Sequence, residues 1–439
     1  MWYDKTMKIA IFSDCYLDLT GGIVSVINIE KAELEKRGHT VEVFSSAYPH
    51  TDAEIAELAK KNIFPVPSCK HFGLGATPIA RRPKIVERWL LKNHPEIKDY
   101  DIFYVHYEAG CSIAGLRLAK KLHIPAVQVM HGREDMGEEN LIPKGLRTFV
   151  ARNLNRFHSW YLPHAKKVTR DNYLATSIAK SKMWTMMVNH ANYANIIITP
   201  SEHFKKKLMH YGVTKKIVAL HHGLSSEKVK INVKPRSLNP GETLNIIWHS
   251  RISGEKRPMA FLEALDILQT KYQKTNYFLD TYGPGPDLER AKKYVKAHHL
   301  KVKFYGPKPF DEIWETMGKA HLDVLVSYNY DTFGMTLIEA EAAGIPSFFV
   351  DKDMEEILPK DSYVLADGPS PEEMARALKD LLEHPERISR MSEILIKNRD
   401  KLDIKYKIDQ LETIFKELKK WKNISPTFWP SPELSSQLF

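Results

Sequence analysis

Short apolar stretches alternate with amphipathic ones along the first half of the chain, and this alternation limits the possible folds more than any other feature. Strand-like stretches occur at 7–13, 40–46, 101–107, 125–131 and 195–201. Stretches with helical spacing lie between them, at 23–38, 112–123 and 202–212. Strands that are separated by helices predict a parallel, doubly wound sheet.

A break rich in proline and glycine, Pro235–Thr243, precedes a second series of the same kind. Its strand-like stretches are 244–250, 277–283, 302–306, 322–328 and 347–351. A chain of 439 residues is too long for one ordinary core, so we predict an α/β protein with two Rossmann-like domains. We place the domains at 1–235 and 236–405, facing each other across a cleft where strands end and helices begin. A helix and tail follow at 406–439, for which packing back onto the first domain is one option.

The composition, 43% hydrophobic and 27% charged residues, is that of a soluble globular protein. No apolar run reaches the roughly 18–20 residues needed to cross a bilayer. The start, MWYDKTMKIAIFSD, predicts a buried strand rather than a signal peptide. Three widely spaced cysteines indicate neither a disulfide framework nor a thiolate metal site. We therefore expect a cytoplasmic location.

The net charge of +10 is concentrated in one part of the chain. Between Pro143 and His190 there are nine lysines and arginines and one acid, Asp171. Such an excess indicates an anionic partner, which can be a nucleic acid, a phosphate-bearing substrate or a membrane surface.

Two basic stretches also carry aromatic and aliphatic side chains at helical spacing. The first is Ala80–Asn93, and the second is the basic region itself, with Phe149, Trp160 and Trp184 among its aromatics. Cations beside aromatics are typical of interfacial membrane helices, of single-stranded nucleic-acid binders, and of ordinary core helices with a solvated face. Together the two stretches favour a membrane surface. The predicted membrane-contact residues are Arg81, Arg82, Lys84, Arg88, Trp89, Arg152, Arg156, Lys166 and Lys167.

Two glycine turns lie between a predicted strand and a predicted helix. Gly21–Gly22 follows the first strand, and Gly283 belongs to the turn Tyr282–Pro286 in the second domain. Backbone amides at such a turn and the helix dipole favour an anion, although a plain tight turn explains each glycine nearly as well.

Charged side chains follow several of the predicted strands. Arg251 and Lys256 come directly after the strand at 244–250, where a guanidinium and an ammonium suit a diphosphate; a solvated charged loop is the alternative. His131 ends another strand and is placed for a role in the cleft, with His106 a weaker case by the same reasoning. The pair Asp351 and Asp353 has the spacing of a metal–nucleotide site, but such triplets are common, and no zinc-like spacing occurs. We predict no metal site.

These motifs, in this order, resemble the retaining glycosyltransferases of family 4, which have the GT-B architecture of two Rossmann-like domains. The resemblance covers nearly the whole chain and includes Gly21–Gly22, the MHG at His131, RISGEK at Arg251–Lys256, YGPGP, and the stretch DTFGMTLIEAEAAGIP from Asp331. The family signature is a glutamate, seven residues and a second glutamate. Here the first position is the shorter Asp331, and the second is Glu339.

The resemblance implies roles for these residues. Glu339 is expected to bind the ribose of the nucleotide sugar, which leaves Glu341 in solvent. Asp331, Lys256, Arg251 and His131 are the expected catalytic residues, with Arg251 and Lys256 stabilising the leaving diphosphate. The expected donor-binding residues are Gly21, Gly22, Gly283, Phe333, Gly334, Met335, Thr336 and Glu339.

The implied reaction transfers a hexose, expected to be glucose, from a UDP-sugar with retention and without a metal or other cofactor. The chain looks most like the bacterial diacylglycerol glucosyltransferases, so we expect a lipid acceptor and a peripheral location on the inner face of the cell membrane. A polysaccharide, teichoic-acid or protein-glycan acceptor is the near alternative. A non-catalytic nucleotide-sugar-binding protein is an alternative of another class, and a nucleic-acid binder ranks last.

Overall fold

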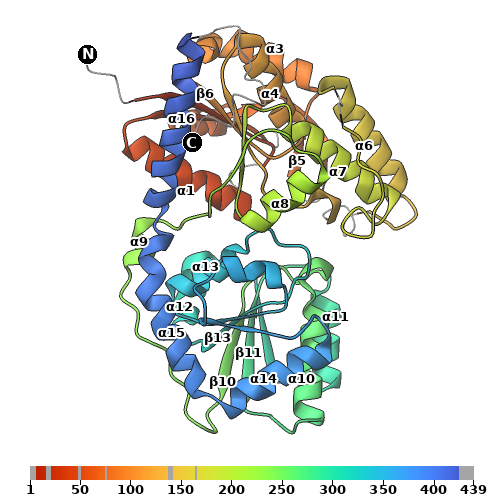
Figure 1. The fold of residues 1–439 in the computed structure, drawn as a ribbon, viewed down its shortest axis with the longest axis vertical. Coiled ribbons are helices and arrows are strands. Elements are labelled where there is room, and N and C mark those ends of the chain that lie inside the picture. The colour runs from red at the N-terminus through yellow and green to blue at the C-terminus, as the bar shows by residue number, and fades with distance from the viewer. Residues whose placement is uncertain are drawn as a thin grey trace. The chain divides into compact units, whose positions relative to one another are not determined.

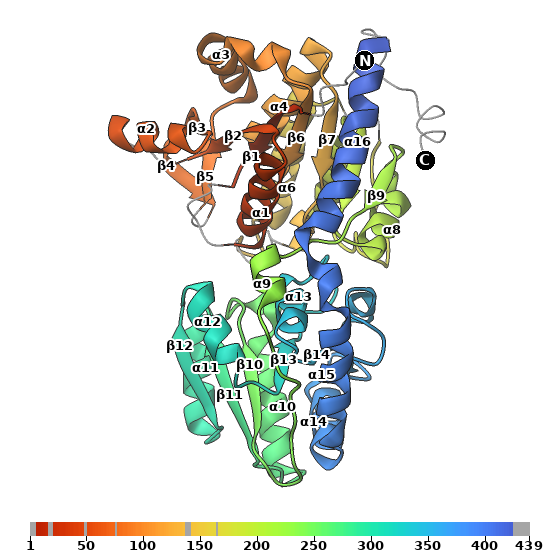
Figure 2. The same ribbon diagram turned by 90° about the vertical axis from the view of Figure 1, so that its left-hand side faces the viewer.

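The computed structural model describes residues 6–15, 21–47, 51–74, 77–136, 142–163 and 166–424. The chain divides into two compact units, each described by itself (Figures 1 and 2). Unit 1 comprises Met1–His221 and Ile404–Phe439, and unit 2 comprises His222–Asp403. The boundaries thus differ from those expected after residues 235 and 405. Residues 222–235 belong to unit 2 because they pack there, with the Leu224 amide donating to the Leu402 carbonyl.

Unit 1 is built on a seven-stranded sheet in the order β3-β2-β1-β6-β7-β8-β9, in which each strand pairs in parallel with its neighbours. Its strands are β1 Lys8–Ser13, β2 Thr40–Ser46, β3 Ile63–Val66, β6 Ile102–His106, β7 Ala126–Val129, β8 Ile196–Thr199 and β9 Ile217–Ala219. A separate antiparallel pair is formed by β4 Ser68–Leu74 and β5 Thr77–Ala80. The chain order reverses between β1 and β6, as in a Rossmann fold.

The helices of unit 1 cover both faces of this sheet. They are α1 Gly22–Lys36, α2 Asp52–Lys60, α3 Pro83–Asn93, η1 Pro95–Asp99, α4 Gly110–Leu122, α6 Arg147–Tyr161, α7 Ile178–Ala191, α8 Glu202–Tyr211 and α16 Ile404–Ile424. Successive side chains of a strand point to opposite faces of a sheet. Alternate residues of β1 therefore contribute to two different hydrophobic cores, one on each face. Ile9 and Ile11 pack with α1 and α16, whereas Ala10 and Phe12 pack with α3 and α4.

The C-terminal helix α16 is part of unit 1 and packs on α1 and β6 (Figure 2). A buried ion pair joins Lys407 Nζ to Glu30 Oε1 at 2.5 Å, and the Tyr104 hydroxyl donates to Glu30 Oε2 at 2.8 Å. Breaking such a pair from one side would leave a buried charge alone, so these contacts fix the position of the helix. Among the described residues, no helix is both long and apolar enough to cross a membrane.

Unit 2 has a six-stranded parallel sheet in the order β12-β11-β10-β13-β14-β15. The strands are β10 Leu244–Trp248, β11 Tyr277–Tyr282, β12 Val302–Gly306, β13 Leu322–Leu325, β14 Ser347–Phe349 and β15 Tyr363–Leu365. The helices are α9 Ser226–Lys230, η2 Gly254–Lys256, α10 Pro258–Thr270, α11 Leu288–Ala297, α12 Phe310–Met317, α13 Met335–Ala342, η3 Lys352–Glu356, α14 Pro371–Glu383, α15 Glu386–Asn398 and η4 Arg399–Leu402. The prediction of two parallel, Rossmann-like sheets is confirmed.

Candidate active site

In unit 2 the strand order reverses between β10 and β13, which lie side by side with Ile247 opposite Asp323. Ligands of doubly wound sheets bind beyond the carboxyl ends of the strands at such a reversal. The segment after β10 carries Arg251 and Lys256, and the segment after β13 carries Asp331. The fold therefore brings two segments that are far apart in the sequence to one edge of the sheet.

Lys256 and Asp331 meet directly at this edge. Lys256 Nζ lies 2.7 Å from Asp331 Oδ1 and 2.8 Å from Oδ2, and both side chains are mostly buried. The Ser327 hydroxyl donates a further hydrogen bond to Asp331. The aspartate therefore accepts charge-assisted hydrogen bonds from Lys256 on one side.

Arg251 lies on the outer side of the same group. Its side chain is 60% exposed, with Nη2 2.9 Å from Glu255 Oε1 and 3.3 Å from the Tyr330 hydroxyl. The Lys256 ammonium lies 5.4 Å from the centre of the Tyr330 ring. The two cations thus flank one tyrosine, and Arg251 is exposed enough to reorient toward an anion.

The glycine turn after β11 supports the segment that carries these cations. A Cβ on Gly283 would lie 2.3 Å from the Ser250 carbonyl oxygen, and one on Gly285 would lie 2.1 Å from that of Ile252. Only glycine allows this close approach. The structure therefore gives Gly283 a role in holding the Ser250–Ile252 backbone, and its expected contact with a donor stays a prediction.

Helix α13 begins at the same edge, after the segment that carries Asp331. Gly334 precedes it with φ +73°, a left-handed conformation that suits glycine. The first amides of a helix have no intrahelical acceptor, so those of Met335 and Thr336 are suited to an anion. The Thr336 hydroxyl oxygen is buried and has no hydrogen-bond partner in the described part of the chain. Phe333 is buried against the edge of the His222 ring, which fixes the start of the helix.

Glu339 lies in a second group at this edge. Its Oε2 is 3.5 Å from His249 Nδ1, and His249 Nε2 is 3.0 Å from Asp323 Oδ1. Burial lowers the pKa of His249, but the carboxylates of Asp323 and Glu339 outweigh it and leave that pKa raised. Burial raises the pKa of Glu339 to about 7, against the opposing charges of His249 and Lys228. Glu339 can thus change its protonation state when a polar ligand binds.

His249 and Asp323 join the candidate site through Glu339, and sequence analysis did not single them out. His249 directly follows β10, so the reasoning that singled out His131 at the end of a strand could have found it. Asp323 gave no such signal, because it lies inside a buried strand, where its Oδ2 accepts a hydrogen bond from Ser347 at 3.1 Å.

The expectation that Glu341 lies in solvent is wrong. Its relative exposure is 3%, and burial raises its pKa to about 8, with only partial compensation from Lys401. The reason is that α13 has neighbours on more than one side, including α15 and η4. The acid next to solvent in this helix is Glu339, which keeps partial exposure.

In unit 1 the expected site residue His131 lies just beyond β7, beside the end of β6. Its Nε2 is 2.9 Å from Nδ1 of His106, and the two rings are stacked. Burial and the positive charge of Lys407 lower the pKa of His131 to about 3. Burial, His131 and Lys407 lower the pKa of His106. Both imidazoles are therefore neutral at physiological pH. They can donate and accept hydrogen bonds, but they do not supply a positive charge.

Three acids that sequence analysis did not single out lie near this histidine pair. Asp14 follows β1 and accepts hydrogen bonds from the amides of Ala109, Cys111 and Ser112 at the start of α4. Glu134 accepts one from the Tyr107 hydroxyl at 3.3 Å, and burial raises its pKa to about 7. Burial, with the negative charges of Glu134 and Asp14, also raises the pKa of Glu108. Their spacing in the sequence follows no motif.

Three further residues that sequence analysis considered are Gly21, Gly22 and Asp351. Gly21 and Gly22 lie in unit 1 at the exposed start of α1. Asp351 is buried and accepts hydrogen bonds from the amides of Asn329 and Asp353, so its carboxylate holds two backbone segments.

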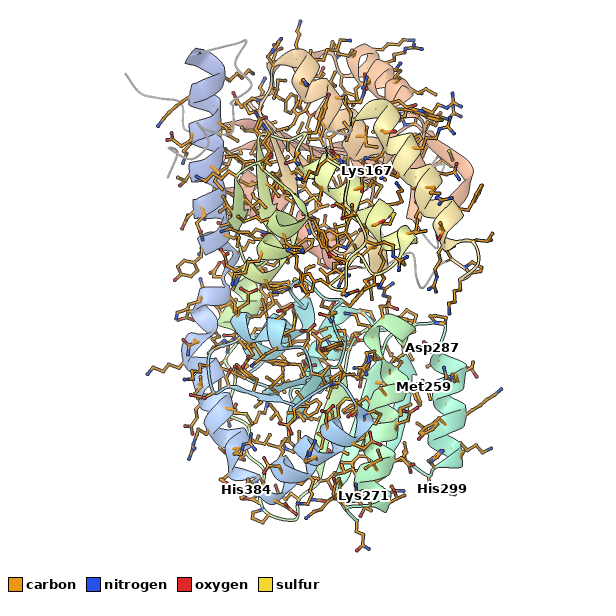
Figure 3. All side chains as sticks on the ribbon, turned by 45° about the vertical axis from the view of Figure 1, so that its right-hand side comes forward. Lys167, Met259, Lys271, Asp287, His299 and His384 are labelled. Carbon is orange, nitrogen blue, oxygen red and sulfur yellow. The ribbon has the colours of Figure 1, made fainter. Side chains whose placement is uncertain are left out.

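The predicted membrane-contact residues lie on or next to α3 and α6, except Lys166 and Lys167. These two lie in the segment before α7, where the Lys166 amide donates to Asn189 Oδ1. Eight of the predicted residues are exposed: Arg81, Arg82, Lys84, Arg88, Arg152, Arg156, Lys166 and Lys167. Lys167 is labelled in Figure 3. Trp89 is half-buried and packs against His94 and the core. On α6, Phe149 and Trp160 are 67% and 66% exposed, and Arg156 lies over the Trp160 ring at 5.5 Å.

The tryptophan and the methionines of the neighbouring helix α7 belong to the core instead. Trp184 and Met187 are completely buried, and Met183 and Met186 nearly so. The basic region thus contains two different helices, α6 with one exposed face and α7 largely buried.

Comparison with protein families accounts for this arrangement. The family model described as "Glycosyltransferase Family 4" matches residues 20–228, and the model described as "Glycosyl transferases group 1" matches residues 230–402. The chain belongs to glycosyltransferase family 4. The two models meet close to the boundary between the units, so each unit of this glycosyltransferase corresponds to one of them.

Curated relatives of this glycosyltransferase include two enzymes named alpha-monoglucosyldiacylglycerol synthase. The one from Streptococcus pneumoniae is 23% identical over 355 residues, which are 77% of this chain and 70% of the relative. The one from Acholeplasma laidlawii is 24% identical over 402 residues, 88% of this chain and 91% of the relative. A lipopolysaccharide 1,6-galactosyltransferase from Escherichia coli is 26% identical over 171 residues, 37% of this chain and 45% of the relative.

Solved structures show the same GT-B fold. The sucrose-phosphate synthase of Thermosynechococcus elongatus superposes with a TM-score of 0.68 at 14% identity, over 94% of this chain and 99% of that one. HepE of Anabaena in complex with UDP-glucose gives a TM-score of 0.62 at 16% identity, over 94% and 100%. At these identities the likeness establishes the fold alone.

Proposed function

We propose that this glycosyltransferase transfers glucose, with retention and without a metal, from UDP-glucose to a membrane lipid such as diacylglycerol. The names of two curated relatives that span most of the chain support this acceptor, and the UDP-glucose complex of HepE supports this donor. The enzyme would work at the inner face of the cell membrane as a peripheral protein.

Unit 2 carries the chemistry that the donor requires. In the transfer, the bond between the anomeric carbon and the phosphate oxygen breaks, and a bond to the acceptor oxygen forms on the same face of the sugar. The acceptor's hydroxyl proton leaves with the UDP phosphate. Negative charge grows on the leaving phosphate, and Arg251, Lys256 and the first amides of α13 would stabilise it electrostatically.

The other donor contacts follow from the same edge of the sheet. Glu339, with a pKa of about 7, would accept hydrogen bonds from the ribose hydroxyls as a carboxylate. Asp331, held by Lys256 and Ser327, would accept hydrogen bonds from hydroxyls of the transferred sugar. The Thr336 hydroxyl, which lacks a partner in the described chain, would donate to a phosphate oxygen.

The observation that carries the lipid acceptor is the outer face of α6. Leu146, Phe149 and Trp160 are large apolar side chains that are more than half exposed, next to the exposed Arg152 and Arg156. A helix that presents apolar bulk between cations gains free energy at an anionic membrane surface from both burial and charge. A soluble glycan acceptor gives no reason for such a face.

A panel of nucleotide sugars, offered against diacylglycerol in vesicles and against soluble glycans, tests the proposal. We expect UDP release from UDP-glucose that depends on diacylglycerol and produces a glucolipid. Equal turnover on soluble glycans would refute the lipid acceptor. The absence of turnover with any nucleotide sugar, with or without acceptor, would refute the enzymatic role itself.

A further inference from the structure

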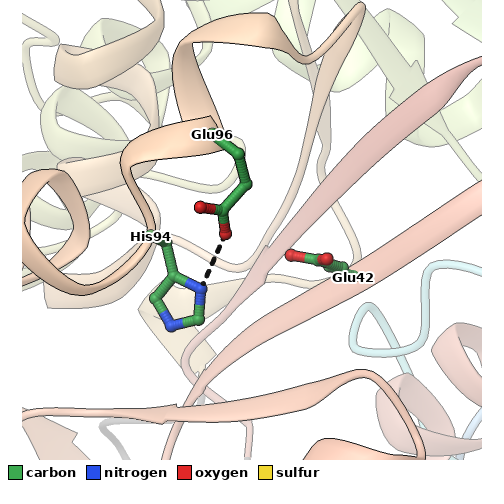
Figure 4. A group of neighbouring side chains, drawn as sticks. All are labelled: Glu42, His94 and Glu96. Atoms are coloured by element: carbon green, nitrogen blue, oxygen red, sulfur yellow. Dashed lines mark hydrogen bonds and ion pairs between the residues drawn. The ribbon is translucent and has the colours of Figure 1, made fainter.

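A histidine and two glutamates meet at the end of α3, and none of the three belongs to the candidate site or to the predicted membrane-contact residues. His94 follows the last residue of α3, and Glu96 lies in η1, with His94 Nδ1 3.2 Å from Glu96 Oε1. Glu42 approaches them from β2 (Figure 4). One ligand atom from each of the three side chains lies within 4.8 Å of the other two.

Glu42 is incompletely satisfied in this position. Its Oε2 is completely buried and has no hydrogen-bond partner in the described part of the chain. A buried carboxylate oxygen without a donor costs free energy unless a cation or a proton compensates it. The Tyr100 side chain also hydrogen-bonds to the Glu42 carboxylate.

The imidazole is held in one orientation by aromatic neighbours. The rings of Phe44, Phe64 and Trp89 lie 5.0, 4.6 and 5.2 Å from that of His94. A ligand whose ring cannot rotate loses little conformational freedom when it coordinates a metal.

We propose that Glu42, His94 and Glu96 bind a divalent transition-metal ion, with Zn²⁺ as the preferred ion. One imidazole nitrogen and two carboxylates are ligands that Zn²⁺ accepts, and two carboxylates neutralise its charge. His94 Nδ1 and Glu96 Oε1 already lie together as a hydrogen-bonded pair, and coordination would replace this hydrogen bond by a bond from each atom to the ion. Water would complete the coordination, since Glu96 is 47% exposed.

The position of the site indicates a structural role. Glu42 lies near the amino end of β2, and His94 and Glu96 precede β6, so the ion would lie toward the end of the sheet opposite His106 and His131. It would tie the end of the basic helix α3 to the sheet. Such an ion is compatible with a transfer reaction that uses no metal.

Zn²⁺ titration of the full chain, after treatment with a chelator, tests this inference by calorimetry. The chain offers a matched control, because His384–Pro385–Glu386 repeats the sequence of His94–Pro95–Glu96. His384 Nδ1 lies 3.7 Å from Glu386 Oε1, but both side chains are exposed and the nearby Asp380 is exposed too. His384→Gln therefore removes a surface histidine of similar sequence context without touching the proposed site.

We expect one Zn²⁺ per chain to bind the wild type and His384→Gln equally, and to raise the melting temperature of both. Glu42→Gln, His94→Gln and Glu96→Gln should each weaken that binding by at least about ten-fold. Glu96→Gln changes an exposed side chain and keeps the fold, so it decides the outcome if the two other variants are unstable. Unchanged Zn²⁺ affinity in Glu96→Gln, or no binding by the wild type, would overturn the inference.

Discussion

Lys256 and Asp331 form an ion pair in which the ammonium nitrogen lies within 2.8 Å of both carboxylate oxygens. Asp331 is one methylene shorter than the glutamate of the family signature, and it still reaches the lysine. The Lys256 ammonium group therefore lies beside Asp331, four residues before the first residue of α13. This pair links the two segments of unit 2 to which we assign donor chemistry.

Lys256→Ala is expected to lower kcat by about 100-fold or more, which is the usual effect of removing one group that stabilises an oxyanion. The KM for the donor should change much less, because the charge on phosphate grows toward the transition state. Steady-state kinetics with the preferred donor measure both. Lys271→Ala is the matched control, since Lys271 lies 5.5 Å from the Tyr272 ring just as Lys256 lies 5.4 Å from that of Tyr330. Equal kcat and KM values in the two variants would show that Lys256 has no role in the transfer.

Asp331→Glu and Asp331→Asn separate the charge of this side chain from its length. We expect Asp331→Glu to keep most of the activity, because a longer carboxylate can still meet Lys256. Asp331→Asn should lose activity by about ten-fold or more, because a charge-assisted hydrogen bond is worth about 1.5–3 kcal/mol. Transfer rates of the three proteins at saturating donor decide this, and an active Asp331→Asn variant would show that the carboxylate is not needed.

Glu339→Gln is expected to weaken UDP binding by about ten-fold or more, since an amide accepts weaker hydrogen bonds from ribose hydroxyls than a carboxylate does. Glu341→Gln, two residues further on the same helix but buried elsewhere, should leave the affinity unchanged. Isothermal titration with UDP compares them. A loss of affinity in both variants would mean that the effect is structural.

Glu341→Gln is instead expected to change stability with pH. The pKa of Glu341 is raised from 4.5 to about 8, so the folded chain binds more protons than the unfolded chain between these values. The free energy of unfolding of the wild type therefore falls as pH rises through this window. The variant lacks this loss, so it should match the wild type near pH 4 and exceed it near pH 9 by a few kcal/mol, at about 1.4 kcal/mol per pKa unit.

Chemical unfolding at the two pH values measures this difference. Glu339 titrates in the wild type and in Glu341→Gln alike, so its contribution to the free energy of unfolding cancels in the comparison. A stability difference that is the same at low and high pH would contradict the assigned pKa shift.

Replacing Phe149 and Trp160 together by serine is expected to reduce binding to vesicles with anionic lipid by more than about ten-fold, because burying one such side chain is worth about 1.5–3 kcal/mol. Flotation of the protein with vesicles measures the bound fraction, and salt should weaken it, since surface charges are screened within about 10 Å at 0.1 M. Tyr406→Ser, which removes an exposed aromatic from α16, is the control. Undiminished flotation of the double variant would show that α6 is not the membrane-facing helix.

Much of this arrangement could be predicted from the sequence where the physical rule is local. Alternating strands and helices gave both parallel sheets, and the rule that side chains beyond a strand's carboxyl end lie at one edge pointed to Arg251, Lys256 and His131. Asp331 was assigned to the site only through the resemblance to a family, and its ion pair with Lys256 was not predicted, because the two residues belong to different strand–helix connections.

The features that could not be predicted depend on contacts between distant segments. His249 meets Asp323 because β10 and β13 are neighbours, which only the strand order shows. Glu341 is buried because α15 and η4 cover α13 from a later part of the chain. Trp184 is buried and Trp160 exposed, although both lie in the same basic stretch, because α7 packs into the core of unit 1 and α6 only partly does.

Glucolipid formation by the wild-type chain tests the central claim most directly. UDP-glucose is supplied with vesicles that contain diacylglycerol and anionic lipid, UDP release is followed, and the anomeric configuration of the product is determined by NMR. The account predicts UDP release that requires diacylglycerol and an α-glucoside on its free hydroxyl. A β-glucoside, or UDP release that is the same with and without diacylglycerol, would contradict it.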